Sequence, residues 1–256
     1  MLPIAQRLRV RYARRGRLRF SSHRDFQRAL ERAIKRAGIP IAYSAGFSPH
    51  PKISYAGAAP TGAASEAEYL ELGVTRRVDR EAVRRDLDAA LPTGLDILEV
   101  VEAAGGALAD RLEVSAWKLE LSAVEPAELR SGVAALLAQN SVTVPRMTKN
   151  GRRDLDIRPT LLRCEVRDPV AESGNRQETH TARSGEGCAP YAILHVVVRH
   201  GTPAVRPDDV LAGLRLAAGT KVATALRATR LAQGPWDTES GTVGDPLASD
   251  RDAPVE

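Results

Sequence analysis

The chain has few cysteines and few aromatic residues, and these scarcities exclude several kinds of protein. Its two cysteines, Cys164 and Cys188, are too few to build a zinc site or hold an iron–sulfur cluster by themselves. Aromatic residues make up only 4% of the chain, so Leu, Val, Ile and Ala must fill most of the core. We therefore expect no bound metal and no cofactor.

Catalytic motifs and membrane signals are also missing. The sequence shows no catalytic triad, no cluster of metal ligands and no phosphate-binding glycine loop. The N-terminus, MLPIAQRLRV, lacks the long apolar core of a signal peptide. No apolar run approaches the roughly 20 residues that a membrane-spanning helix needs. These absences favour a reduced, cytoplasmic protein that binds a partner over an enzyme.

Positive charge is concentrated near the N-terminus. The net charge is +5, but residues 1–60 carry 13 Lys and Arg against Asp25 and Glu31, which gives +11 there and −6 for the rest. Such an asymmetry is typical of a surface for nucleic acid or another acidic partner. A solvated basic surface is the alternative, because a charge run alone is weak evidence.

Residues 7–20 alternate apolar and charged side chains, which predicts a bent strand or an edge hairpin. Leu8, Val10 and Tyr12 would then face the core. The arginines between them would form a row exposed to solvent.

The next segment predicts an amphipathic helix with a basic outer face. Ser22 is the expected N-cap, with Asp25 three residues later, and Gly38 marks the end. The apolar face comprises Phe26, Ala29, Leu30, Ala33, Ile34 and Ala37. The opposite face carries Arg24, Arg28, Arg32 and Lys35, with Glu31 as the only acid among them. Most of these cations lack an acid at i+4, so they either serve a partner or form an ordinary solvated surface.

A stiff loop with aromatic and imidazole side chains follows this helix. Pro49 and Pro51 bias the residues before them toward extended conformations. Phe47 and His50 are then suited to stack on a base and to approach a phosphate. In the structural alternative, Phe47 fills the core and the backbone satisfies His50.

The predicted elements over residues 7–101 follow the order β-α-β-β-α-β, the ferredoxin-like arrangement. The later elements of this half are a strand over 68–74, a helix over 79–91 and a strand over 95–101. The second half repeats the scheme with a strand over 113–124, a helix over 127–138, a strand over 191–199, a helix over 208–217 and a strand over 222–231.

An extra hairpin distinguishes the second half. Its strands, over 142–147 and 155–166, flank the strong turn signal Asn150-Gly151. We therefore expect an α+β fold of two tandem ferredoxin-like modules with antiparallel sheets. The domains would be residues 1–104, residues 105–233 with a flexible insertion at 167–189, and a disordered acidic tail at 234–256.

Two segments of the sequence resemble the radical-SAM-linked family of uncharacterised bacterial proteins. They are SSHRDFQRALERAIKRAGIPIAYSAGFSPHPKISYAGAAPTGAASEAEYLEL and RMTKNGRRDLDIRP, which include the Ser-His-x-Asp and Gly-Phe-x-Pro-His-Pro motifs. The resemblance spans most of residues 7–231 and implies a link to radical-SAM chemistry on RNA, without an assigned activity. Because the CxxxCxxC motif that holds the cluster is absent, a separate protein would carry that chemistry.

These observations together predict an RNA-binding accessory protein that works with a separate radical-SAM enzyme in RNA modification or processing. tRNA and rRNA are the candidate RNAs. The expected interface residues are Arg17, Arg19, Arg24, Arg28, Tyr43, Phe47, His50, Lys52, Lys149, Arg152 and Arg158. The cations would contact phosphates, and the three ring-bearing side chains would contact bases.

Two other functions stay open. Tandem ferredoxin-like modules are also similar to the fold of endoribonucleases that process CRISPR repeats, so His23, His50 and Tyr43 are candidates for the general acid and base. The third hypothesis is a docking adaptor whose basic face meets an acidic protein, with no nucleic acid involved. None of the three requires a membrane.

Overall fold

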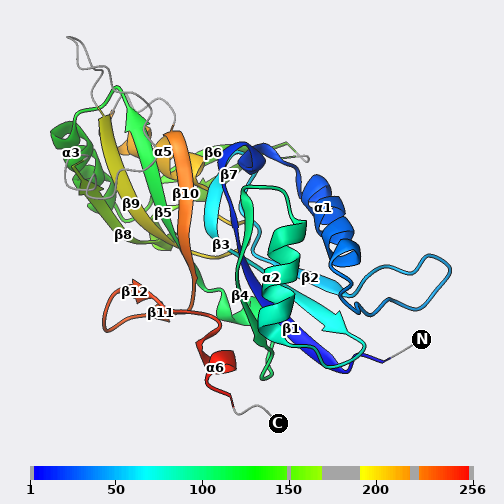
Figure 1. Cartoon of the computed structure of the whole chain (residues 1–256). Coiled ribbons are helices and arrows are strands. Elements are labelled where there is room, and N and C mark those ends of the chain that lie inside the picture. The colour runs from blue at the N-terminus through cyan, green and yellow to red at the C-terminus, as the bar shows by residue number, and fades with distance from the viewer. Residues whose placement is uncertain (1–2, 149–150, 169–190, 220–224, 254–256) are drawn as a thin grey trace. The chain divides into compact units, whose positions relative to one another are not determined.

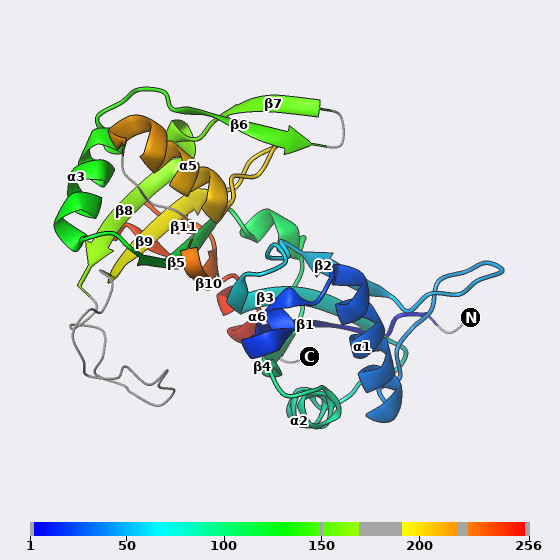
Figure 2. The same cartoon turned by 90° about the horizontal axis from the view of Figure 1, so that it is seen from above.

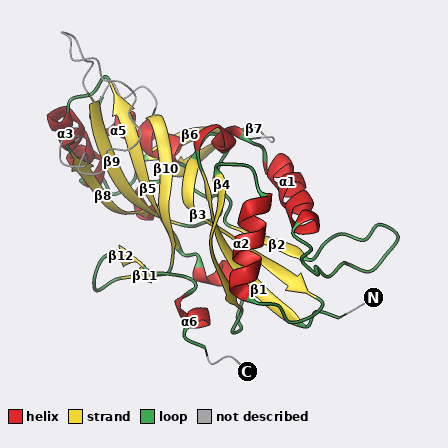
Figure 3. Ribbon diagram, viewed as in Figure 1, coloured by secondary structure: helices red, strands yellow, loops and turns green. Residues whose placement is uncertain are grey.

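The computed structural model describes residues 3–148, 151–168, 191–219 and 225–253. The chain divides into two compact units, of which unit 1 comprises Met1–Glu113 and Arg230–Glu256 and unit 2 comprises Val114–Thr229. Each combines helices with antiparallel strands, which confirms the predicted α+β class (Figures 1 and 3). The first boundary lies after Glu113, whereas the sequence predicted it after residue 104.

Unit 1 contains a four-stranded antiparallel arrangement with two helices in its connections. The strands are β1 (Gln6–Arg14), β2 (Ile53–Ala56), β3 (Ala64–Val74) and β4 (Leu95–Glu102). The helices are α1 (His23–Arg36) and α2 (Arg80–Ala90). β1 lies between β4 and β3, and β2 pairs with the outer side of β3.

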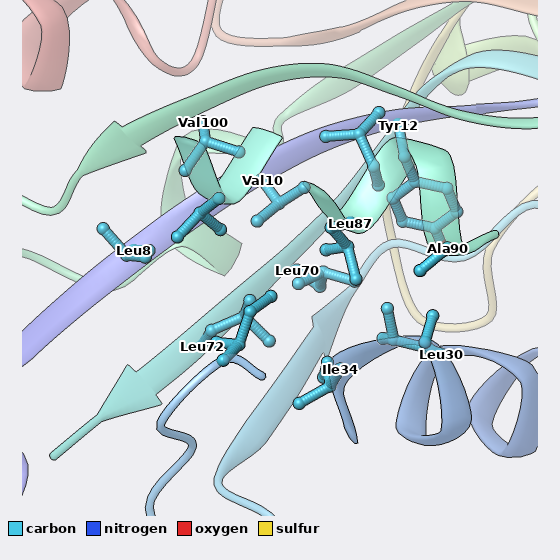
Figure 4. Close-up of a cluster of buried hydrophobic side chains, with 14 of the residues drawn as sticks. Leu8, Val10, Tyr12, Leu30, Ile34, Leu70, Leu72, Leu87, Ala90 and Val100 are labelled. Carbon is cyan, nitrogen blue, oxygen red and sulfur yellow. The ribbon is translucent and has the colours of Figure 1, made fainter. Parts of the chain in front are cut away.

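The main core of unit 1 lies between this sheet and the two helices. Leu8, Val10 and Tyr12 alternate along β1 and are buried against apolar side chains of α1 and α2, as predicted (Figure 4). The helices supply Leu30, Ile34 and Leu87, among others, to the same cluster. Period-2 alternation in the strand and the apolar stripes of the helices therefore meet in one core.

The opposite face of the sheet is covered by the C-terminal segment. This segment contains the end of β10 (Ala225–Gly234), β11 (Trp236–Asp237), β12 (Thr242–Val243) and α6 (Ala248–Arg251). Leu247 is fully buried in a second cluster with residues of β3, β4 and η2 (Leu108–Arg111). The structure therefore folds residues 234–253 onto unit 1, where the sequence predicted a disordered tail. Composition pointed to disorder because the few apolar residues of the tail are scattered among Gly, Pro and acids.

The expected row of exposed arginines on β1 is wrong for Arg9, and Arg14 at the end of the strand is buried as well. Arg9 is only 1% exposed and Arg14 only 5%. Arg9 forms ion pairs with Asp250 and Glu71, and Arg14 donates to backbone carbonyls before β3. Burial of these guanidinium groups is possible because the C-terminal segment and neighbouring loops supply acceptors.

The strand predicted to continue to residue 20 ends at Arg14. Residues Gly16–Phe20 form the 3₁₀ helix η1 instead. Gly16 has φ +55°, which turns the chain out of the sheet. Leu18 packs against the core, but Phe20 is 60% exposed.

Unit 2 places two helices in the connections of its own antiparallel strands. The strands are β5 (Val114–Ser122), β8 (Leu161–Arg167), β9 (Tyr191–Arg199) and the first part of β10. β9 lies between β5 and β8, and β5 pairs with β10 on its other side. α3 (Pro126–Leu137) and α5 (Pro207–Ala218) pack against each other.

The predicted hairpin of unit 2 has different boundaries. β6 (Thr143–Thr148) pairs with β7 (Gly151–Asp156), and η3 (Arg158–Thr160) separates this hairpin from β8. Most of the predicted insertion at 167–189 lies outside the described residues. None of the helices in the described part of the chain is long and apolar enough to span a bilayer.

Candidate functional site

Helix α1 carries an exposed basic face that its local sequence explains. Ser22 Oγ accepts a hydrogen bond from the Asp25 backbone N–H at 3.2 Å, which is the predicted N-cap. Gly38, at φ +64°, follows the last turn. The apolar side is buried, and the opposite side exposes Arg24, Arg28, Arg32 and Lys35.

The charges of these four cations are available to bind an anionic partner. Among the ion pairs of the described residues, none involves a cation of this face. Helix α2 differs, because its Arg84 pairs with Glu81 and its Arg85 with Asp86. The pKa of Asp25 is lowered, first by the hydrogen bond from Ser22 Oγ and further by the positive charges of Arg28 and Arg24.

The loop after α1 is fixed at its base by backbone hydrogen bonds. Ser44 N donates to His50 O at 2.8 Å, and His50 N donates to Ser44 Oγ at 2.9 Å. Tyr43 and Pro51 form an isolated antiparallel bridge. Below it, Lys52 N donates to Ala42 O at 2.7 Å, and both residues bond to the backbone of Gly73 in β3. The loop therefore projects from a rigid stem attached to the sheet (Figures 1 and 2).

Between α1 and this loop lies a pocket of about 400 Å³, which we call the α1 groove. Its lining residues are Arg28, Glu31, Arg32, Ile34, Lys35, Ile41, Tyr43, Pro49, His50 and Pro51. The helix supplies three cations and one carboxylate, a net charge of +2 with His50 neutral. The loop supplies the ring-bearing side chains, and two isoleucines add apolar surface. Such a mixture suits an anion that also carries a flat ring.

Three of the predicted interface residues meet in this groove. Arg28, Tyr43 and His50 all line it, and Tyr43 is 48% exposed. The predicted interface did not include Arg32 and Lys35, although the sequence placed both on the basic face. Their spacing of four and seven residues from Arg28 is the signal that would have added them.

Other predicted residues of unit 1 do not line the groove. Phe47 is fully exposed near the loop tip, which excludes the alternative in which it fills the core. Arg24 and Lys52 are also exposed. Arg17 and Arg19 belong to η1, where the Arg19 guanidinium lies 4.6 Å from the centroid of the adjacent Phe20 ring.

His23, the second histidine named for catalysis, contacts side chains of unit 1 outside the groove. Its Nε2 lies 3.1 Å from Gln27 Nε2. Its ring meets the ring of Tyr55 edge-on, with centroids 4.9 Å apart. It does not line the groove, and no group of three or more potential metal ligands occurs in the described ranges.

The predicted interface also included three basic residues of unit 2. Lys149 lies outside the described residues. Arg152 is exposed, with Nε 3.4 Å from Asp154 Oδ1. Arg158 instead donates to Leu137 O at the end of α3, from Nε at 3.2 Å and Nη2 at 3.1 Å. Its guanidinium therefore caps a helix, a role that single-sequence patterns do not reveal.

The sequence matches a known protein family. A family described as "Uncharacterized protein conserved in bacteria (DUF2344)" matches residues 7–207, and the chain belongs to this family. No curated protein matches the chain.

Proposed function

We propose that this member of the DUF2344 family is an RNA-binding accessory protein and that the α1 groove holds the RNA backbone. The observation that carries the proposal is the meeting of three cations, which form no ion pair among the described residues, with Tyr43 and His50 in one pocket. Lys and Arg neutralise phosphates, and aromatic rings stack on unpaired bases.

The fold supports this location. We propose that both units are ferredoxin-like modules, since the orders β4-β1-β3-β2 and β10-β5-β9-β8 fit that arrangement. RNA-binding domains with such sheets commonly stack bases on the sheet face that lacks helices. In unit 1 the C-terminal segment covers that face, so the groove beside α1 is the better surface for RNA.

The partner is the second part of the proposal. We propose that a separate radical-SAM enzyme modifies or processes the bound RNA. Support comes from the resemblance of the segments around α1, its loop and the β6–β7 hairpin to the radical-SAM-linked family. It also comes from the cysteine count, because two cysteines cannot form the three-cysteine cluster motif. Co-purification of such an enzyme with the tagged protein, before and after nuclease treatment, tests this part.

The central experiment removes the charge of the groove. The triple variant Arg28→Ala/Arg32→Ala/Lys35→Ala is compared with Arg80→Ala/Arg84→Ala/Arg85→Ala, which removes the same charge from α2. Binding of labelled tRNA, rRNA fragments and single-stranded RNA is followed by fluorescence anisotropy between low and moderate salt. In a plot of log K against log salt concentration, the slope for the groove variant should be less steep by about 2. Each of the three lost phosphate contacts accounts for roughly 0.7 of this change.

The control variant should leave that slope unchanged. Equal losses of RNA affinity in both variants would show that binding depends on overall charge and not on the groove. Unchanged RNA binding in the groove variant would contradict the proposal, and loss of an acidic protein partner instead would favour the docking adaptor.

One observation supports a second candidate function. Tyr43 and His50 line the same groove, and a metal-independent endoribonuclease needs a general acid and base at the 2′-hydroxyl. RNA cleavage in the presence of EDTA that disappears in His50→Ala would establish this activity. Intact RNA after prolonged incubation with the wild-type protein would exclude it.

A further inference from the structure

We infer that the α1 groove is a pocket for one unpaired nucleotide and that Glu31 selects its base; this inference rests on the proposed RNA binding. The base would lie against Tyr43, the phosphate would meet the cations of α1, and Glu31 would accept a hydrogen bond from an exocyclic amino group. The preferred RNA is therefore one that presents a bulged or single-stranded adenine, cytosine or guanine rather than uracil.

The size of the groove supports a single nucleotide. Its volume of about 400 Å³ lies near the small end of the 300–1,000 Å³ range typical of small-molecule pockets. A duplex keeps its bases stacked inside and presents mainly backbone to a protein. A pocket of this size admits a base only when that base has left the stack.

The distribution of side chains supports the orientation. Tyr43, Pro49, His50 and Pro51 all come from the loop, and the charged residues all come from α1. A nucleotide likewise has a flat base at one end and an anionic phosphate at the other. The bridge between Tyr43 and Pro51 fixes the backbone that carries the tyrosine. Because the loop is already positioned, little conformational entropy is lost when a base stacks on it.

Selection of the base would explain why the carboxylate of Glu31 lies in an otherwise cationic pocket. Its negative charge contributes to raising the pKa of Tyr55, although burial of that phenol contributes more. Among the ion pairs of the described residues, none uses Glu31, even though Lys35 lies one helical turn away. The carboxylate therefore remains available as an acceptor. Carboxylates accept from the amino group of cytosine, and adenine and guanine offer similar donors, whereas uracil has no exocyclic amino group.

The experiment uses the full chain and a set of RNA hairpins with one stem sequence. One hairpin is fully paired, and the others carry a single bulged adenine, cytosine, uracil or abasic nucleotide. Affinities are measured by anisotropy at fixed salt for the wild type, Tyr43→Ala, Tyr43→Phe and Glu31→Ala. Phe20→Ala removes an exposed aromatic ring outside the groove and is the matched control, and Phe47→Ala tests for base contact at the loop tip.

The bulged adenine and cytosine hairpins should bind the wild type roughly tenfold more tightly than the paired hairpin, within the 5- to 150-fold expected of one stacked base. Tyr43→Ala should abolish this preference, whereas Tyr43→Phe, Phe20→Ala and Phe47→Ala should keep it. Glu31→Ala should bind all hairpins somewhat more tightly, because a negative charge is lost, and should no longer distinguish adenine or cytosine from uracil.

Several results would overturn the inference. Equal binding of paired and bulged hairpins with normal salt dependence removes the nucleotide pocket but leaves the proposed RNA binding intact. If the preference for bulged hairpins is lost in Phe47→Ala, the base is bound at the loop tip and not in the groove. Competition by free AMP or CMP at the concentrations at which bulged RNA competes would make the groove a site for free nucleotides. No binding of any hairpin or single strand would overturn the proposed function and the inference together.

Discussion

The C-terminal segment should stabilise unit 1 mainly through Asp250, whose side chain is fully buried. Arg9 Nη1 donates to both carboxylate oxygens of Asp250, at 2.7 and 2.8 Å. Arg111 Nη1 donates to Oδ2 at 2.7 Å, and the Ala104 N–H donates to Oδ1 at 2.9 Å. The substitution Asp250→Asn keeps the shape of this side chain but leaves the buried Arg9 guanidinium without its principal counter-charge.

The size of the effect follows from the burial of both partners. Removing one member of a buried ion pair costs about 3–5 kcal/mol, because the other charge stays in a region of low dielectric. Glu71, at 3.1 Å from Arg9 Nε, retains part of the compensation, so we expect the lower end of this range. With roughly 2–4 °C lost per kcal/mol and a loss near 3 kcal/mol, the melting temperature of unit 1 should fall by about 6–12 °C.

The pH dependence provides a second test of the same pair. Burial alone would raise the pKa of Asp250, but the hydrogen bonds from Arg9, Ala104 and Arg111 outweigh it and lower the pKa below 3.8. Since this pKa is lower in the folded state, the stabilisation is present above pH 3.8 and is lost as the pH falls through the folded value. The difference between wild type and Asp250→Asn should therefore be constant near neutral pH and shrink in acid.

Urea and thermal unfolding followed by circular dichroism measure these differences. Asp252→Asn, at an exposed position of the same segment, is the matched control and should change stability by less than about 0.5 kcal/mol. The double variant Arg9→Met/Asp250→Leu should be less destabilised than Asp250→Asn, because it removes both charges together. An Asp250→Asn protein within about 1 kcal/mol of the wild type would refute the reasoning that the buried charge needs this partner.

Three further substitutions test local features of the fold. Ser22→Ala should destabilise unit 1 by about 1 kcal/mol in urea, because the N-cap of α1 is lost, whereas Ser22→Thr should retain most of it. Gly57→Ala should cost about 1–3 kcal/mol, since φ is +58° and the new Cβ would lie 2.3 Å from Gln233 Oε1; an unchanged midpoint would contradict this geometry. Arg158→Ala should cost about 1.5 kcal/mol by uncapping α3 at Leu137 while RNA affinity stays the same. A loss of RNA affinity with normal stability would instead restore Arg158 to the interface.

The sequence predicted well wherever the signal was local. In α1, the cap at Ser22, the end near Gly38 and the division into apolar and basic faces all depend on residues within a few turns of one another. The rigid base of the loop likewise follows from Pro49 and Pro51. Such features need only backbone sterics and helical periodicity, which a single sequence contains.

Predictions failed where a distant segment decided the outcome. Alternation along β1 placed Arg9 opposite the core correctly, but it gave no information about what covers that face. The partner, Asp250, lies 241 residues away in the chain. The same limitation hid the role of Arg158, since the carbonyl that it caps belongs to another element. Periodicity identifies the faces of an element, but tertiary packing decides which of them is solvated.

Whether a cation is buried or exposed therefore decides how much the N-terminal excess of positive charge contributes to binding. Part of the N-terminal excess is neutralised within the fold, because Arg9 pairs with Asp250 and Arg15 pairs with Glu66 and Asp96. These arginines stabilise the fold and offer little charge to a partner. The cations that line the groove without an ion pair in the described part of the chain are Arg28, Arg32 and Lys35. Attraction of a polyanion to unit 1 should therefore depend on the outer face of α1 more than on the arginine-rich first strand, even though that strand holds the denser run of positive charge.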